Sequence, residues 1–82
     1  MMIDGTSTMM EPRTVSGHEL LPLGIVAGRA IYRLTSHGEA YRLTPDIGAA
    51  YLLRRESDGY SGVFENLETA VAYIATLEQQ EQ

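Results

Sequence analysis

The segment Tyr32–Thr44 reads YRLTSHGEAYRLT, in which the tetrapeptide YRLT occurs twice, once on each side of a His-Gly pair. Each copy alternates apolar and polar residues, which is typical of a strand with one buried face. A two-residue loop at His37-Gly38 would join the two copies as a β-hairpin. The predicted cross-strand pairs are Tyr32 with Leu43, Leu34 with Tyr41, and Arg33 with Arg42. Two pairs form an apolar face, and the arginine pair lies on the opposite face.

A second hairpin is predicted further along the chain. Residues 50–56 form its first strand, and Asp58-Gly59 favours a tight two-residue turn. The pairs predicted from that turn are Leu53 with Phe64, Arg54 with Val63, Arg55 with Gly62, and Leu52 with Glu65. Both hairpins then carry aromatic residues and leucine on one face, so the two predictions support a common core.

The residues before the first hairpin are less regular. Residues 1–14 mix Gly, Thr, Ser, Pro and Met without periodicity, so we predict a disordered leader followed by a single domain over residues 15–82. We expect a turn or irregular structure over residues 15–23. Residues 24–35 form either one long strand with a bulge at Gly28 or two strands divided by a turn there.

The C-terminal segment predicts an amphipathic helix. Asn66 is a favourable N-cap residue. The apolar residues that follow have the spacing of one helical stripe, namely Leu67, Ala70, Val71, Ile74 and Leu77. The predicted fold is therefore α+β: an antiparallel sheet of three to five strands, built from two consecutive hairpins, with one face covered by the C-terminal helix.

Composition limits the classes of function. The chain has 82 residues and a net charge of −5. It contains no cysteine, which excludes disulfides and zinc–thiolate sites. All six basic residues are arginine. Five of them lie in residues 29–55 against two carboxylates, whereas residues 56–82 carry six carboxylates and no basic residue. A net acidic chain argues against general electrostatic binding of nucleic acid.

The sequence shows no catalytic or metal-binding pattern. His18 and His37 are expected in loops, the serines lie in turn-like stretches, and no phosphate-binding loop or nucleophile motif occurs. We therefore predict no enzymatic activity, no catalytic residues, no metal and no cofactor. There is no apolar run of membrane-spanning length and no secretory signal, so a cytoplasmic location without membrane association is expected.

The arginines are the only reactive or charged side chains that the sequence gathers into one region with a predicted common face. Arg33 and Arg42 as direct neighbours repel each other, so a carboxylate on an adjoining strand, an anionic ligand or a partner should offset their charge. The predicted partner-binding residues are Arg33, Arg42, Arg54, Arg29 and Leu52. Arginine mixed with exposed aliphatic residues is typical of protein-contact surfaces. A solvated face with an internal Arg–Glu lattice is the alternative interpretation.

These observations predict a small non-enzymatic protein-binding module, an inhibitor or regulator that occupies a partner surface through this face. By analogy of size and charge alone, such chains are common among accessory proteins of phages and mobile elements, including inhibitors of CRISPR systems. Nucleic-acid binding through the same arginines is a second class. The third is a self-assembling structural subunit, because a homodimer would add buried surface to a small domain.

Overall fold

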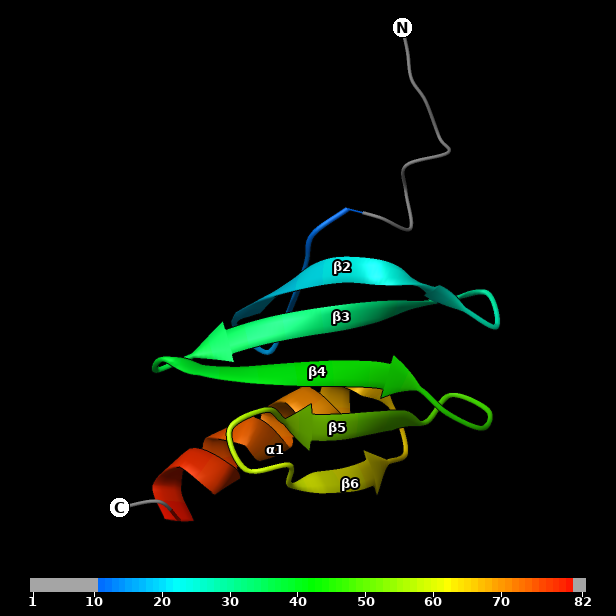
Figure 1. The fold of residues 1–82 in the computed structure, drawn as a ribbon. Helices are drawn as coiled ribbons and strands as arrows, with labels where there is room; N and C mark the ends of the chain where they lie inside the picture. Colours follow the sequence, from blue (N-terminus) through cyan, green and yellow to red (C-terminus); the bar gives the residue numbers. More distant parts are fainter. Residues whose placement is uncertain (1–10, 81–82) are drawn as a thin grey trace, which may run out of the picture.

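The computed structural model describes residues 11–80, which form one antiparallel sheet and one helix (Figure 1). The elements are β1 (Arg13–Val15), β2 (His18–Val26), β3 (Arg29–Ser36), β4 (Glu39–Pro45), β5 (Tyr51–Arg55), β6 (Ser61–Phe64) and α1 (Leu67–Gln80). Each strand pairs with the next one along the chain. The α+β class is confirmed, but the described residues form six strands rather than the three to five that were predicted.

Two-residue turns account for the additional strands. Three consecutive hairpins turn at Ser16-Gly17, Ala27-Gly28 and His37-Gly38, and φ is positive at all six residues. Positive φ at both loop residues defines the type I′ turn, whose twist matches that of paired strands. The predicted His37-Gly38 turn is confirmed. Gly28 is a turn residue rather than a bulge, so the two-strand alternative for residues 24–35 is correct.

The prediction of irregular structure over residues 15–23 is wrong. Those residues contain the end of β1 and most of β2, joined by the Ser16-Gly17 turn. Pro22 lies in β2, where the register shifts between Pro22 and Gly24, and such irregularities let a strand accommodate proline. Of the predicted leader, residues 1–10 lie outside the described residues, whereas Arg13 and Thr14 belong to β1.

The two predicted hairpin registers had different outcomes. The β3–β4 pairs of Tyr32 with Leu43, Leu34 with Tyr41 and Arg33 with Arg42 are confirmed. The β5–β6 register is wrong, because the structure pairs Tyr51 with Phe64, Leu52 with Val63, Leu53 with Gly62 and Arg54 with Ser61. A shift of two residues leaves every side chain on its predicted face, because side chains alternate with a period of two.

A longer loop causes this shift. Residues 56–59 form the connection, closed by Arg55 N–H donating to Tyr60 O at 2.8 Å and Gly59 N–H donating to Arg55 O at 2.9 Å. Only Gly59 in this loop has positive φ, so Asp58-Gly59 does not form a type I′ turn. Asp58 instead accepts a hydrogen bond from the Tyr60 N–H at 3.0 Å, a bond that stabilises the longer loop.

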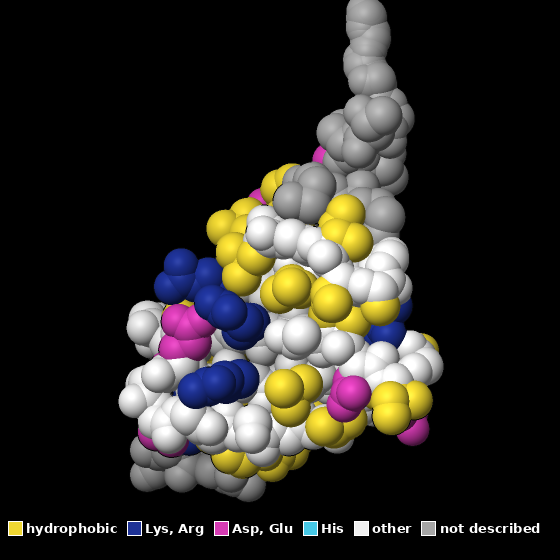
Figure 2. Space-filling view, turned by 45° about the vertical axis from the view of Figure 1, so that its right-hand side comes forward, with side chains coloured by type: hydrophobic (Ala, Val, Ile, Leu, Met, Phe, Trp, Pro, Cys, Tyr) yellow, Lys and Arg dark blue, Asp and Glu magenta, His cyan; other side chains and the backbone are white. Residues whose placement is uncertain are grey.

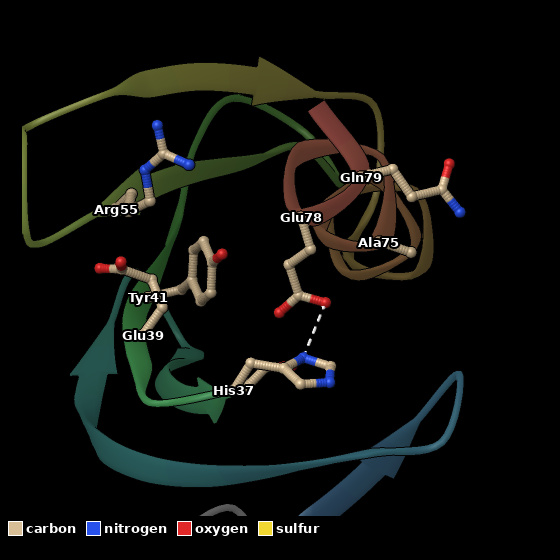
Figure 3. A pocket seen from close by; sticks show the side chains of 8 residues that line it. His37, Glu39, Tyr41, Arg55, Ala75, Glu78 and Gln79 are labelled. Carbon is tan, nitrogen blue, oxygen red and sulfur yellow. Dashed lines mark hydrogen bonds and ion pairs between the residues drawn. The ribbon is translucent and has the colours of Figure 1, made fainter. Parts of the chain in front are cut away.

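The core lies between the sheet and α1. The sheet curves around the helix (Figures 1 and 3), and β1 reaches its first turn, where Arg13 and Glu68 form an ion pair at 3.5 Å. The most completely buried large side chains are Tyr41, Leu20, Leu34, Leu43, Leu53, Ile74 and Val71. The predicted helical stripe is buried, and the Thr69 N–H donates to the Asn66 side chain at 2.8 Å, which confirms the N-cap.

Substitution of two adjacent leucines in β5 tests which face of the sheet packs against the core. Leu53 is fully buried, whereas Leu52 is only partly buried on the opposite face. We expect Leu53→Ala to lower the free energy of unfolding by about 2–5 kcal/mol and Leu52→Ala to lower it by less than half as much. Urea denaturation followed by circular dichroism measures both values. Equal losses would contradict the assignment of the core face.

Candidate functional site

Three of the predicted partner-binding arginines lie side by side on the sheet face that points away from α1. Arg33 of β3 pairs with Arg42 of β4, which pairs with Arg54 of β5. We call these three residues the arginine row. Their side chains are exposed, with about half of the Arg33 and Arg42 side-chain surface accessible. The predicted Arg33–Arg42 contact pair is therefore extended by a third guanidinium on the next strand.

An aliphatic group lies beside the arginine row on the same face. Leu52, the fifth predicted residue, pairs with Val63 of β6 and lies two positions before Arg54. Ile31 lies two positions before Arg33 and is partly buried, whereas Val63 is 59% exposed. Two positions along a strand correspond to about 7 Å, so the two groups adjoin. Figure 2 shows basic and hydrophobic side chains gathered next to each other on this surface.

Glu56 supplies part of the negative charge that the arginine pair requires. It lies in the β5–β6 loop rather than on an adjoining strand as predicted, with carboxylate oxygens 4.0 Å from Arg33 Nη2 and 3.7 Å from Arg42 Nε. Within residues 11–80, Arg54 forms no ion pair, and it borders a hollow of about 310 Å³ together with Arg42 and Glu56. The row thus contains three positive charges and one nearby carboxylate.

Arg29 lies apart from the arginine row and makes contacts within the fold. Its guanidinium donates hydrogen bonds to the carbonyl oxygens of Asp46 at 2.7 Å, Ala50 at 2.6 Å, and Gly48. It also lies over the Tyr51 ring, 4.7 Å from the centroid. These contacts hold the β4–β5 loop against the start of β3. The structure therefore brings together Arg33, Arg42, Arg54 and Leu52, but not Arg29.

A polar cavity between the sheet and the last turns of α1 was not predicted from the sequence. Its volume is about 470 Å³, and its polar lining includes Ser36, His37, Glu39, Tyr41, Arg55 and Glu78 (Figure 3). Tyr41 and Arg55 are almost completely buried, whereas His37 lies at the exposed rim. In Figure 3 the Glu78 side chain points from the helix toward His37, and the two are joined at 3.1 Å.

Two periodicities in the sequence could have indicated this cavity. Odd-numbered residues of β5 point inward, which places Arg55 on the same face as Tyr51 and Leu53. Glu78 follows Ile74 by four residues and so lies beside the apolar stripe of α1. From the sequence, His37 is predicted only as a turn residue, and no predicted contact joins Arg55 to Glu78.

Ser36, His37 and Glu78 are the residue types of a catalytic triad, but their geometry differs from one. Ser36 Oγ lies 3.2 Å from His37 Nδ1, and Glu78 Oε1 lies 3.1 Å from the same nitrogen. A triad histidine contacts its serine and its acid through opposite ring nitrogens, so that a proton can pass from the serine to the ring. This arrangement therefore lacks the relay that would activate Ser36 as a nucleophile.

Three groups at or near the cavity have shifted pKa values. A hydrogen bond with Ser36 is the main cause that lowers the pKa of Glu78, and contact with His37 adds to the effect. Burial, followed by the charge of Glu78, raises the pKa of Tyr41. Hydrogen bonds from Arg55 at 3.1 and 2.8 Å, together with the one from the Tyr60 N–H, lower the pKa of Asp58 to about 2. The Arg55–Asp58 pair is thus bidentate, the strongest form of this interaction.

Comparison with protein-family models, curated proteins and solved structures finds no match for this chain. Within residues 11–80, no group of three or more His, Cys, Asp or Glu side chains could hold a metal ion. The helix of the described part is too short and too polar to cross a membrane. Among the described residues, the arginine row and its aliphatic neighbours form the exposed surface with the most concentrated charge.

Arg29 and Arg54 provide a matched test of structural and surface arginines. We expect Arg29→Gln to lower the free energy of unfolding by about 1–2 kcal/mol, because hydrogen bonds to several loop carbonyls are lost. Arg54→Gln should change it by less than about 0.5 kcal/mol. Urea denaturation of both variants measures the difference. A larger loss for Arg54→Gln would show that the arginine row stabilises the fold.

The pH dependence of stability tests the Arg55–Asp58 pair. The folded-state pKa of Asp58 lies near 2, below its usual value of 3.8, so its contribution to stability is present above pH 4 and is lost as the pH falls toward 2. Asp58→Asn should therefore weaken the dependence of the urea midpoint on pH between pH 5 and pH 2. Asp46→Asn is the control, because the Asp46 side chain forms no ion pair within the described residues. An unchanged dependence in Asp58→Asn would contradict the assignment.

Proposed function

We propose that this chain is a small non-enzymatic protein-binding module that occupies the surface of a partner through the arginine row and the adjoining aliphatic residues. The observation that supports this most directly is the outer face of the sheet, which no helix or strand of residues 11–80 covers. Three guanidiniums on neighbouring strands lie there beside Leu52 and Val63. Arginine next to exposed aliphatic side chains is enriched where proteins bind each other, and buried arginines often dominate the affinity.

The charge of this face favours a different protein over a second copy of the chain. In a symmetric dimer the same patch lies on both sides of the interface. Two arginine rows facing each other would then bring six positive charges together with only two nearby carboxylates. An acidic surface on another protein has no such penalty. We therefore prefer an inhibitor or regulator of another protein, of the kind that phages and mobile elements carry, to a self-assembling subunit.

The position of the tyrosines favours a protein over a nucleic acid. Sheets that bind single-stranded nucleic acids stack bases on exposed aromatic side chains. Tyr32, Tyr41 and Tyr51 are all buried against the helix side of the sheet. The outer face offers arginine and aliphatic residues, which suit a protein surface better than a base.

Affinity capture tests the proposal. The tagged protein is exposed to an extract of its source cells, and the retained proteins are identified by mass spectrometry. We expect Arg33→Gln with Arg42→Gln to reduce retention of the specific partner at least about tenfold, because two central interface arginines are lost. Ala72→Glu with Thr76→Glu is the control, since it changes the net charge by the same −2 on the exposed side of α1 and should leave retention unchanged.

Circular dichroism of both double variants is the control that tests whether the fold is intact. Retention of the partner by the arginine double variant at the level of the unmodified protein would refute the proposed surface. An equal loss in both double variants would attribute binding to overall charge rather than to the arginine row. Either result would remove the basis of the proposed function.

A further inference from the structure

Within residues 11–80, Glu56 contacts the arginine row at distances longer than those of hydrogen bonds. Its oxygens lie 3.7 and 4.0 Å from the nearest nitrogens of Arg42 and Arg33. Charge-assisted hydrogen bonds between arginine and carboxylate are about 2.7–2.9 Å long. The same loop contains such a contact, because Asp58 lies 2.8 Å from Arg55 Nη2. Glu56 thus offsets charge without satisfying the guanidinium donors of Arg33 and Arg42.

We propose that Glu56 is a resident competitor, which holds the position between Arg33 and Arg42 where a carboxylate of the partner binds. This inference rests on the proposed function and specifies the partner's chemistry: an acidic protein segment with several Asp or Glu side chains. One such side chain replaces Glu56, and another reaches Arg54. A guanidinium that faces a carboxylate of its own can then form the bidentate contact that Glu56 does not make.

The dimensions of the row fit a segment with several carboxylates. Adjacent strands lie about 4.8 Å apart, so the three arginines span about 10 Å. A single small anion can contact only part of that length, whereas neighbouring acidic side chains of one polypeptide can contact all three. About one-third of the Glu56 side-chain surface is exposed, and the residue lies in a loop rather than in a strand, so its side chain can move aside without breaking the sheet.

If Glu56 competes in this way, its carboxylate lowers the affinity of the arginine row for an acidic segment. A partner carboxylate must displace an existing ion pair, and exposed ion pairs of this type have modest strength. Removing the Glu56 charge should therefore tighten the binding of an acidic segment about two- to fivefold. A general increase in positive charge would act on any acidic molecule from any position, so the effect must depend on where the charge is removed.

A defined probe allows the inference to be tested without the natural partner. Hexaglutamate is titrated at low salt into the full chain labelled with ¹⁵N, and the arginine Nε signals are followed by NMR. We expect shifts at Arg33, Arg42 and Arg54. Glu56→Gln should bind about two- to fivefold more tightly than the unmodified protein. Glu65→Gln, which removes one charge from an exposed carboxylate outside the sheet, should bind like the unmodified protein.

Several results would overturn the inference. These are a Glu56→Gln affinity equal to that of the unmodified protein, an equal gain in Glu65→Gln, or the absence of any shift at the arginine row. Tighter binding of a ten-residue oligothymidine at the same arginines would identify a nucleic acid as the occupant instead. If Glu56→Gln fails but the arginine double variant still loses its captured partner, the proposed function stands and only the competition is wrong.

Discussion

A single helix must cover a sheet of six strands in the described part of this chain, and that constraint determines the rest of the structure. One helix can bury only one sheet face, so the sheet curves around α1 and buries three tyrosines and four leucines on the inner side, namely Tyr32, Tyr41, Tyr51, Leu20, Leu34, Leu43 and Leu53. The outer face is left to whatever side chains the strand alternation puts there. The arginine row is therefore a direct consequence of the register that builds the core.

The same residue type serves three purposes in this fold because its surroundings differ. Arg29 joins a loop to a strand through carbonyl oxygens and an aromatic ring. Arg55 points inward and is held by the bidentate contact with Asp58. The arginine row lies on the outer face, with Glu56 at ion-pair distance only. Only this last group combines exposure, repeated positive charge and aliphatic neighbours, and the functional proposal therefore rests on it.

Side chains of the β5–β6 loop contact groups on both faces of the sheet. Its Asp58 closes the loop around Arg55 on the inner side, and its Glu56 approaches Arg33 and Arg42 on the outer side. A two-residue loop at Asp58-Gly59 would have shifted the register and placed Glu56 within the strand. The longer loop therefore determines both the β5–β6 register and the position of the carboxylate that we propose as a competitor.

The sequence by itself determined the hairpin at His37-Gly38, the neighbouring position of Arg33 and Arg42, and the apolar stripe of α1. These features depend on local turn chemistry and on side-chain periodicity, both of which a sequence displays directly. Only the tertiary structure decided the role of Arg29, the β5–β6 register, the polar cavity and the contact of Glu56 with the row. Each of those depends on which distant groups meet after the sheet curves around the helix, and periodicity carries no information about such contacts.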